Sequence, residues 1–119
     1  MATCVDVSGA AYPRQLNGRT IQPMEGRSLV PAFQGKTIQR EALYWEHEGN
    51  RAIRIGRWKL VAKGPAGKWE LYEVDHDRTE LNDLAQAQPE QVKSMADQWA
   101  AWARRTSTLP WPWKPPYGK

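Results

Sequence analysis

Residues 43–62 read LYWEHEGNRAIRIGRWKLVA, and this stretch decides the fold. Polar and apolar residues alternate through 51–55 and again through 58–63, as they do in strands that bury one face. Gly49 and Gly56 divide the stretch at the spacing of tight hairpin turns. We therefore predict consecutive antiparallel strands over 42–47, 51–55 and 58–63.

The residues after this stretch extend the sheet and add a helix. Alternation returns over 68–74, after the turn sequence Pro65-Ala66-Gly67. Pro89 suits the first turn of a helix, and apolar residues then recur at spacings of three and four to about Arg105. Trp99 and Trp102 fall on that apolar face. The predicted fold class is α+β, with a four-stranded antiparallel sheet packed against one C-terminal helix.

The chain divides into three segments by composition. Residues 1–36 are loop-rich, with a short helix ending at Gly9 and a helical turn within 28–33. So long a segment with so little periodicity is expected to lie across another body of protein. Residues 37–106 carry the sheet and helix. Residues 107–119 form a Pro/Trp-rich tail, for which we expect Trp111 and Trp113 to dock on a main domain, with sugar stacking as the alternative.

Composition excludes several classes of function. The 119 residues carry a net charge of +4, but basic and acidic residues are interleaved, which argues against a nucleic-acid partner. Cys4 is the single cysteine, so neither an internal disulfide nor a thiolate zinc cluster is predicted. No apolar run is long enough to cross a bilayer, and residues near Asp6 and Arg14 do not read as a signal peptide.

The turn at the centre of the deciding stretch supplies the candidate site residues. We predict that His47, Asn50 and Arg51 bind substrate, because a strand end and turn can offer side chains to a neighbouring pocket. The alternative is that Arg51 pairs with Glu48 across the hairpin and that His47 is a packing residue. Glu46, His47 and Glu48 are adjacent on a strand, so they point to opposite faces and predict no metal site. No catalytic residue is predicted.

The order of motifs along the chain resembles the C-terminal subdomain of sulfatases of the arylsulfatase type. The resemblance covers nearly the whole chain, and the succession of motifs is more specific than any one of them. The resemblance rests on the motifs Tyr12-Pro13, Pro23-Met24-Glu25-Gly26-Arg27-Ser28-Leu29, Trp45 to Arg54, Trp58-Lys59-Leu60-Val61, Trp69-Glu70-Leu71-Tyr72, the polar turn Asp77 to Ala85, and Trp99-Ala100-Ala101-Trp102-Ala103.

The resemblance implies a C-terminal fragment of an arylsulfatase-like sulfuric ester hydrolase of alkaline-phosphatase-like fold. Such a fragment completes the fold and contributes to the substrate pocket, and residues 1–36 would dock on a catalytic domain that this sequence does not contain. A sulfate ester would bind only to the full enzyme, and full-length relatives are usually periplasmic or secreted. No localisation is predicted for this chain itself.

The family's chemistry uses calcium and a formylglycine made from the cysteine of a Cys-x-Pro-Ser-Arg motif. Cys4 does not match this motif, since Asp6, Val7 and Ser8 stand where Pro, Ser and Arg are required. We therefore predict no cofactor in this chain and no activity from it alone. The alternative function is a free-standing binding module for a sulfated carbohydrate or another polyanion, which the positive charge and the tryptophans favour.

Overall fold

The computed structural model describes residues 1–108 of the chain. The predicted docking of Trp111 and Trp113 lies outside the described residues. The chain forms two compact units, Met1–Arg40 and Glu41–Lys119. None of the helices among the described residues combines the length and apolar character needed to cross a membrane.

The first unit contains two short helices and a small hairpin. Its elements are α1 (Ala2–Ser8), β1 (Gln15–Leu16), β2 (Arg19–Thr20) and α2 (Val30–Phe33). As predicted, α1 ends at Gly9, which adopts the left-handed conformation at φ 65°. The helical turn expected within 28–33 is α2. The residue before α2 is hydrogen-bonded to α1, because the backbone N–H of Leu29 donates to Oγ1 of Thr3 (3.0 Å).

The hairpin of the first unit is an element that periodicity does not predict, because each strand is only two residues long. Asn17 and Gly18 form its turn with φ of 49° and 74°. Two successive positive φ angles are what a type I′ hairpin turn requires, and Asn-Gly adopts them most readily. All residues of Met1–Arg40 are described, and none of them is buried. The first unit therefore has secondary structure without a core of its own.

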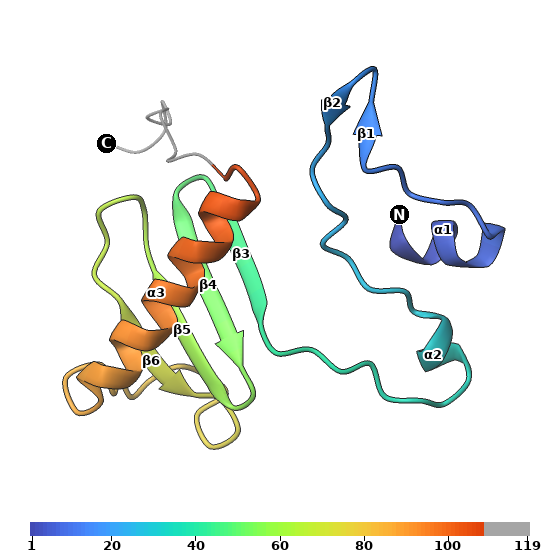
Figure 1. The fold of residues 1–119 in the computed structure, drawn as a ribbon. Helices are drawn as coiled ribbons and strands as arrows, with labels where there is room; N and C mark the ends of the chain where they lie inside the picture. Colours follow the sequence, from blue (N-terminus) through green and yellow to red (C-terminus); the bar gives the residue numbers. More distant parts are fainter. Residues whose placement is uncertain (109–119) are drawn as a thin grey trace. The chain divides into compact units, whose positions relative to one another are not determined.

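The second unit is the predicted sheet with its helix. Its strands are β3 (Leu43–His47), β4 (Asn50–Ile55), β5 (Trp58–Ala62) and β6 (Glu70–Glu73), in that order across the sheet. Each neighbouring pair is antiparallel. The helix α3 (Pro89–Arg105) crosses one face of the sheet (Figure 1). The α+β prediction is confirmed, and α3 has the bounds that its apolar spacing predicted.

The core lies between the sheet and α3. Ile53, Leu60 and Leu71 are fully buried and stand opposite one another on β4, β5 and β6. Met95 of α3 is fully buried against them. Burial of these four side chains removes their apolar surface from water, which is the main favourable contribution to folding.

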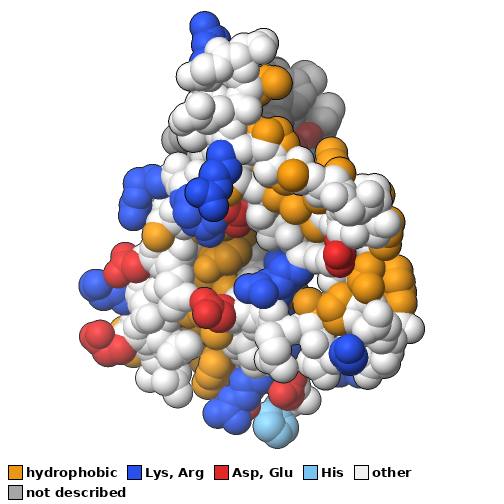
Figure 2. Space-filling model, turned by 45° about the vertical axis from the view of Figure 1, so that its right-hand side comes forward, with side chains coloured by type: hydrophobic (Ala, Val, Ile, Leu, Met, Phe, Trp, Pro, Cys, Tyr) orange, Lys and Arg blue, Asp and Glu red, His pale blue; other side chains and the backbone are white. Residues whose placement is uncertain are grey.

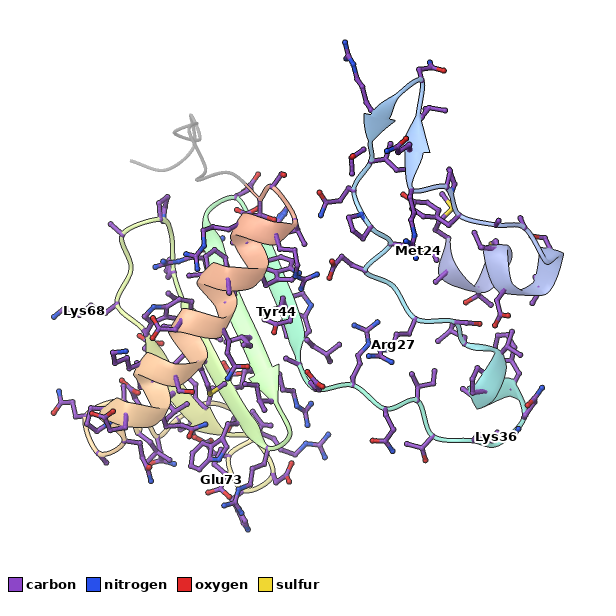
Figure 3. All side chains as sticks on the ribbon, viewed as in Figure 1. Met24, Arg27, Lys36, Tyr44, Lys68 and Glu73 are labelled. Carbon is purple, nitrogen blue, oxygen red and sulfur yellow. The ribbon has the colours of Figure 1, made fainter. Side chains whose placement is uncertain are left out.

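Aromatic rings extend this contact toward the C-terminal end of α3. Tyr44, labelled in Figure 3, stacks on Trp102 with ring centroids 5.0 Å apart. Trp99 contacts Trp69 edgewise and Trp102 in a tilted arrangement, and its indole N–H donates to the carbonyl of Trp45 (3.0 Å). Trp99 and Trp102 thus pack on the sheet, as their helical spacing predicted. They tie α3 to β3, one of the two edge strands of the sheet.

The segment between β6 and α3 returns along β6. The carboxylate of Asp83 accepts hydrogen bonds from the backbone N–H of Leu71 (3.0 Å) and of Ala85 (2.8 Å). The N–H of Leu84 donates to the carbonyl of Leu71 (2.8 Å). Asp77 caps the preceding turn by accepting from the N–H groups of Leu81 and Asn82, and these bonds lower the pKa of the Asp77 carboxyl. The polar turn predicted after the fourth strand is therefore an ordered, hydrogen-bonded segment.

Candidate functional site

The turn between β3 and β4 is a two-residue hairpin loop. Glu48 and Gly49 have φ of 51° and 82°, and His47 pairs with Asn50 to close the turn. Positive φ at both loop positions matches the right-handed twist of the flanking strands. The backbone N–H of Gly49 donates to Oε1 of Glu46 (2.8 Å). Glu48 therefore lies in the loop, outside the register of paired residues. Within that register, Glu46 stands opposite Arg51.

The loop between β5 and β6 supports this turn. The side-chain amide of Asn50 donates to the carbonyl of His47 (2.9 Å) and accepts from the N–H of Gly64 (2.9 Å). A Cβ at Gly49 would lie 2.7 Å from the ring of Pro65, so the two loops are in close contact. Asn50 is therefore a bracing residue, with its amide oxygen and nitrogen both engaged inside the protein.

Arg51 extends from the opposite face of β4, beneath α3. Its Nη2 donates to the carbonyl of Gly67 (2.9 Å). Its guanidinium carbon lies 4.6 Å from the ring centroid of Trp69 and 5.7 Å from that of Trp99. The Nε atom is buried and has no hydrogen-bond partner within residues 1–108. The structure thus gives Arg51 these partners in place of the pairing with Glu48 that the alternative interpretation expected.

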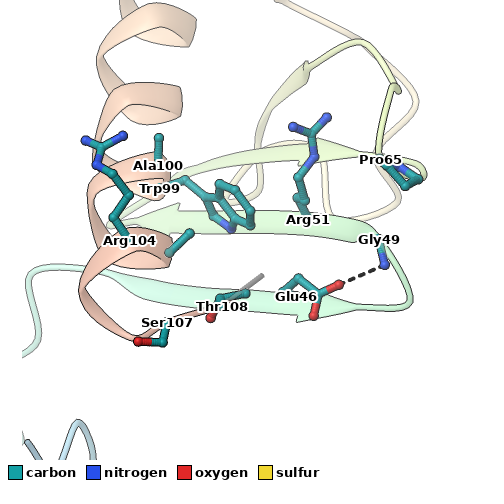
Figure 4. Close-up of a pocket in the computed structure, with 10 residues that line it drawn as sticks. Glu46, Gly49, Arg51, Pro65, Trp99, Ala100, Arg104, Ser107 and Thr108 are labelled. Carbon is teal, nitrogen blue, oxygen red and sulfur yellow. Dashed lines mark hydrogen bonds between the residues drawn. The ribbon is translucent and has the colours of Figure 1, made fainter. Parts of the chain in front are cut away.

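The strand alternation separates the three predicted site residues. His47 and Asn50 line a pocket of about 460 Å³ on the sheet face that α3 leaves open, together with Trp45, Lys59 and Lys63 among others. A second pocket, of about 580 Å³, lies between the β3–β4 turn and the C-terminal end of α3 (Figure 4). Arg51 borders both, but its guanidinium stacks on rings of the helix side.

The open-face pocket mixes aromatic, basic and acidic groups. Trp45 is 46% exposed, and Lys63 is exposed beside it. Lys59 forms an ion pair with Glu80. Residues Lys59, Lys63 and Glu70 were not predicted as site residues. Alternation along β5 and β6 could have identified these three residues. Once the register is known, it places them on the same face as Asn50 and Ala52.

Tyr72 stands opposite Lys59 in the sheet, so it lies on the open face. It is 7% exposed, and its hydroxyl donates to Oε2 of Glu70 (3.0 Å). Burial, followed by this hydrogen bond and the negative charges of Glu70, Asp83 and Glu80, raises the pKa of Tyr72 to about 12. The hydroxyl therefore stays protonated as a donor at neutral pH.

The described residues do not fit the calcium or the formylglycine that a sulfatase resemblance implies. Among residues 1–108, no group of three or more His, Cys, Asp or Glu side chains is placed to hold a metal ion. Cys4 is exposed and lies in α1 without the flanking proline and arginine of the formylglycine motif. On the face shown in Figure 2, Lys and Arg side chains are interspersed with Asp, Glu and apolar side chains.

The second unit is thus an α+β fold, with a four-stranded antiparallel sheet and one helix on one face. No family model matches the chain. A search by sequence finds an uncharacterized sulfatase of Schizosaccharomyces pombe, 26% identical over 116 residues, which cover 92% of this chain and 21% of that protein.

Solved structures show the same fold. A structure from a study of glycosaminoglycan metabolism by Bacteroides thetaiotaomicron aligns with a TM-score of 0.67 at 18% identity, over 87% of this chain and 24% of that one. A protein in complex with its substrate D-glucosamine-2-N,6-O-disulfate aligns with a TM-score of 0.66 at 20% identity, over 95% and 25%. A 2-O glycosaminoglycan sulfatase aligns with a TM-score of 0.62 at 21% identity, over 88% and 24%.

The chain is therefore a homologue of part of a sulfatase, and the predicted resemblance is confirmed. It spans about a fifth to a quarter of the length of these relatives. The sheet and helix of the second unit have the fold found in the sulfatase structures.

Proposed function

We propose that this chain is the C-terminal subdomain of an arylsulfatase-like sulfuric ester hydrolase, which acts only together with a catalytic domain. The subdomain completes the fold and lines part of the substrate pocket. The nucleophile and the calcium ligands come from the catalytic domain, because Cys4 and the carboxylates of residues 1–108 do not fit those roles.

The absence of a core in the first unit carries this proposal. All residues of Met1–Arg40 are described and none is buried, although α1, α2 and the hairpin are ordered by hydrogen bonds. Phe33 is 72% exposed and Val7 is 68% exposed. A segment that orders its backbone without burying side chains has no internal compensation for the lost conformational entropy. A covering body of protein supplies that compensation, and the catalytic domain is the body that sulfatase homology implies.

The substrate in this proposal is a sulfated saccharide. Two of the structural neighbours act on or bind such compounds, namely the 2-O glycosaminoglycan sulfatase and the protein bound to D-glucosamine-2-N,6-O-disulfate. The exposed side chains of Trp45 and His47 suit the non-sulfate part of a sugar, which stacks on aromatic faces and accepts hydrogen bonds. Asn50 shapes this surface, since its amide is engaged with His47 and Gly64.

The first test is the genomic sequence upstream of the Met1 codon. We expect an in-frame extension that encodes a Cys-x-Pro-Ser-Arg motif. The purified chain alone should release no sulfate from 4-nitrocatechol sulfate, while the same sample with an added sulfatase should do so. An in-frame stop codon upstream, or sulfate release by the chain itself, contradicts the proposal.

The second test measures docking of the first unit. The upstream segment is co-expressed with this chain, and the two are purified through a tag on one of them. Phe33→Asp should reduce co-purification, because it places a charge in an apolar contact. Gln34→Asp is the matched control, since it adds the same charge to the neighbouring C-cap position of α2 and should leave co-purification unchanged.

A binding module for a sulfated carbohydrate remains the second candidate, favoured by the exposed Trp45 and Lys63 in one pocket. It predicts that the chain alone is monodisperse and binds a sulfated oligosaccharide. The sulfatase subdomain predicts association through the exposed apolar groups of the first unit instead. Gel filtration with and without the oligosaccharide separates the two.

A further inference from the structure

We propose that Arg51 is a positioning residue that fixes the β3–β4 turn from the helix side. This changes the role that its place in the sequence suggested. The inference rests on the proposed function only for its consequence, namely that the fixed turn presents His47 to a substrate.

Arg51 joins its own strand to two segments that are distant in the sequence, the β5–β6 connection and α3. Its guanidinium donates to Gly67 in the β5–β6 loop, stacks on Trp69 just before β6, and lies near Trp99 of α3. A planar guanidinium can stack on a ring and donate in its own plane at the same time, whereas the ammonium of lysine cannot. The site therefore requires arginine in particular, and a positive charge alone is not sufficient.

The β5–β6 loop that Arg51 holds is the loop that supports the turn. Asn50 bonds to Gly64 on the open-face side, Gly49 packs on Pro65, and Arg51 bonds to Gly67 on the helix side. The loop is itself tightly closed, since a Cβ at Gly67 would lie 2.0 Å from the carbonyl oxygen of Lys63. The turn and the loop are thus fastened to each other from both faces of the sheet.

The environment of the guanidinium fits a positioning role. Nε is excluded from solvent without a hydrogen-bond partner among the described residues, and Nη2 donates to Gly67. Trp69 and Trp99 lie over the guanidinium. A buried N–H left unpaired is unfavourable, and the neighbouring rings are what retain it in this position.

The test uses the full chain and nuclear magnetic resonance of ¹⁵N-labelled protein. In the unmodified chain, the Hε proton of Arg51 should resonate upfield through the ring currents of Trp69 and should exchange with water at least about tenfold more slowly than that of Arg54. Arg54 is the matched comparison, because it lies on the same strand, donates from Nε to the carbonyl of Gly56 and is exposed. Equal exchange rates for the two arginines overturn the proposal without any variant.

Substitution tests the link to the turn. Arg51→Lys and Arg51→Met should shift the amide signals of Gly49 and Gly64 and the ring signals of His47, while the amides of Ile53 and Leu60 stay protected. Arg54→Met should leave all of these signals in place. Unchanged turn signals in Arg51→Met overturn the proposal. Loss of the Ile53 and Leu60 protection in both Arg51 variants does so too, since it makes Arg51 a general determinant of folding. None of these readouts involves a substrate, so they are independent of the proposed sulfatase function.

Discussion

A single glycine, Gly49, allows the β3–β4 turn to approach the β5–β6 loop closely. Gly49 combines φ of 82° with contact against Pro65, so both its backbone conformation and the space around it exclude a side chain. Gly56, in the next turn, has φ of 53° but open space around it. Comparing substitutions at Gly49 and Gly56 therefore distinguishes the cost of a positive φ from the cost of a steric contact.

We expect Gly49→Ala to destabilise the chain by about 2–3 kcal/mol, and Gly56→Ala by about 1 kcal/mol. The larger loss reflects the displacement of Pro65 in addition to the positive φ. Urea unfolding followed by tryptophan fluorescence measures both. Equal losses for the two variants would show that the loop contact contributes nothing.

Tyr72 gives the stability of the chain a dependence on alkaline pH. Its pKa is about 12 in the folded chain, against the usual 10. Between these values the unfolded chain has lost the proton and the folded chain has kept it, so raising the pH favours unfolding. This stabilisation is complete below pH 10 and is lost as the pH rises through 12. Subtracting the absorbance titration at 295 nm of Tyr72→Phe from that of the unmodified chain should leave a transition near pH 12. A difference centred near pH 10 would contradict the burial of this hydroxyl.

At the scale of elements, α3 and the sheet depend on one another. Met95 is the fully buried residue that α3 contributes to the core, whereas Asp97, two residues later, is exposed and pairs with Lys93. Met95→Ala should cost about 2–4 kcal/mol of the free energy of unfolding, through lost burial and a cavity. Asp97→Ala should cost about 0.5 kcal/mol or less, the usual value of an exposed helical ion pair. Thermal unfolding followed by circular dichroism at 222 nm compares them, and similar losses would argue against a core centred on Met95.

The elements were predictable where a pattern ran over several residues. The alternation of β4 and β5 and the three-and-four spacing of α3 placed these elements within a residue or two of their observed bounds. The hairpin at Asn17 and Gly18 was missed because its strands are too short to show alternation. The three candidate site residues were grouped by nearness in sequence, but alternation along β4 sends Asn50 and Arg51 to opposite faces. The role of Arg51 depends on Gly67 and Trp99, which only the folded chain brings near it.

At the scale of the whole molecule, the two units differ in what holds them together. Glu41–Lys119 contains the fully buried residues, and the wholly described unit Met1–Arg40 contains none. Trypsin at low concentration should therefore cleave the isolated chain first after Lys36 and Arg40, which are exposed, and spare Arg54 and Lys59 within the sheet. Mass spectrometry should find a lasting fragment that begins near Glu41. Early cleavage inside β4 or β5 would contradict the division into units.

The contacts of Trp45 and Leu71 limit how a partner can join the sheet. The central carbonyl of β3 is occupied by the Trp99 indole, and the outer side of β6 is occupied by Asp83 and Leu84. On β6, the backbone N–H and carbonyl of Leu71 are thus already engaged, which hinders strand addition at that edge of the sheet. A protein that associates at β6 is therefore left with side-chain contacts at Leu71, so its selectivity there should depend on surface chemistry and little on backbone pairing.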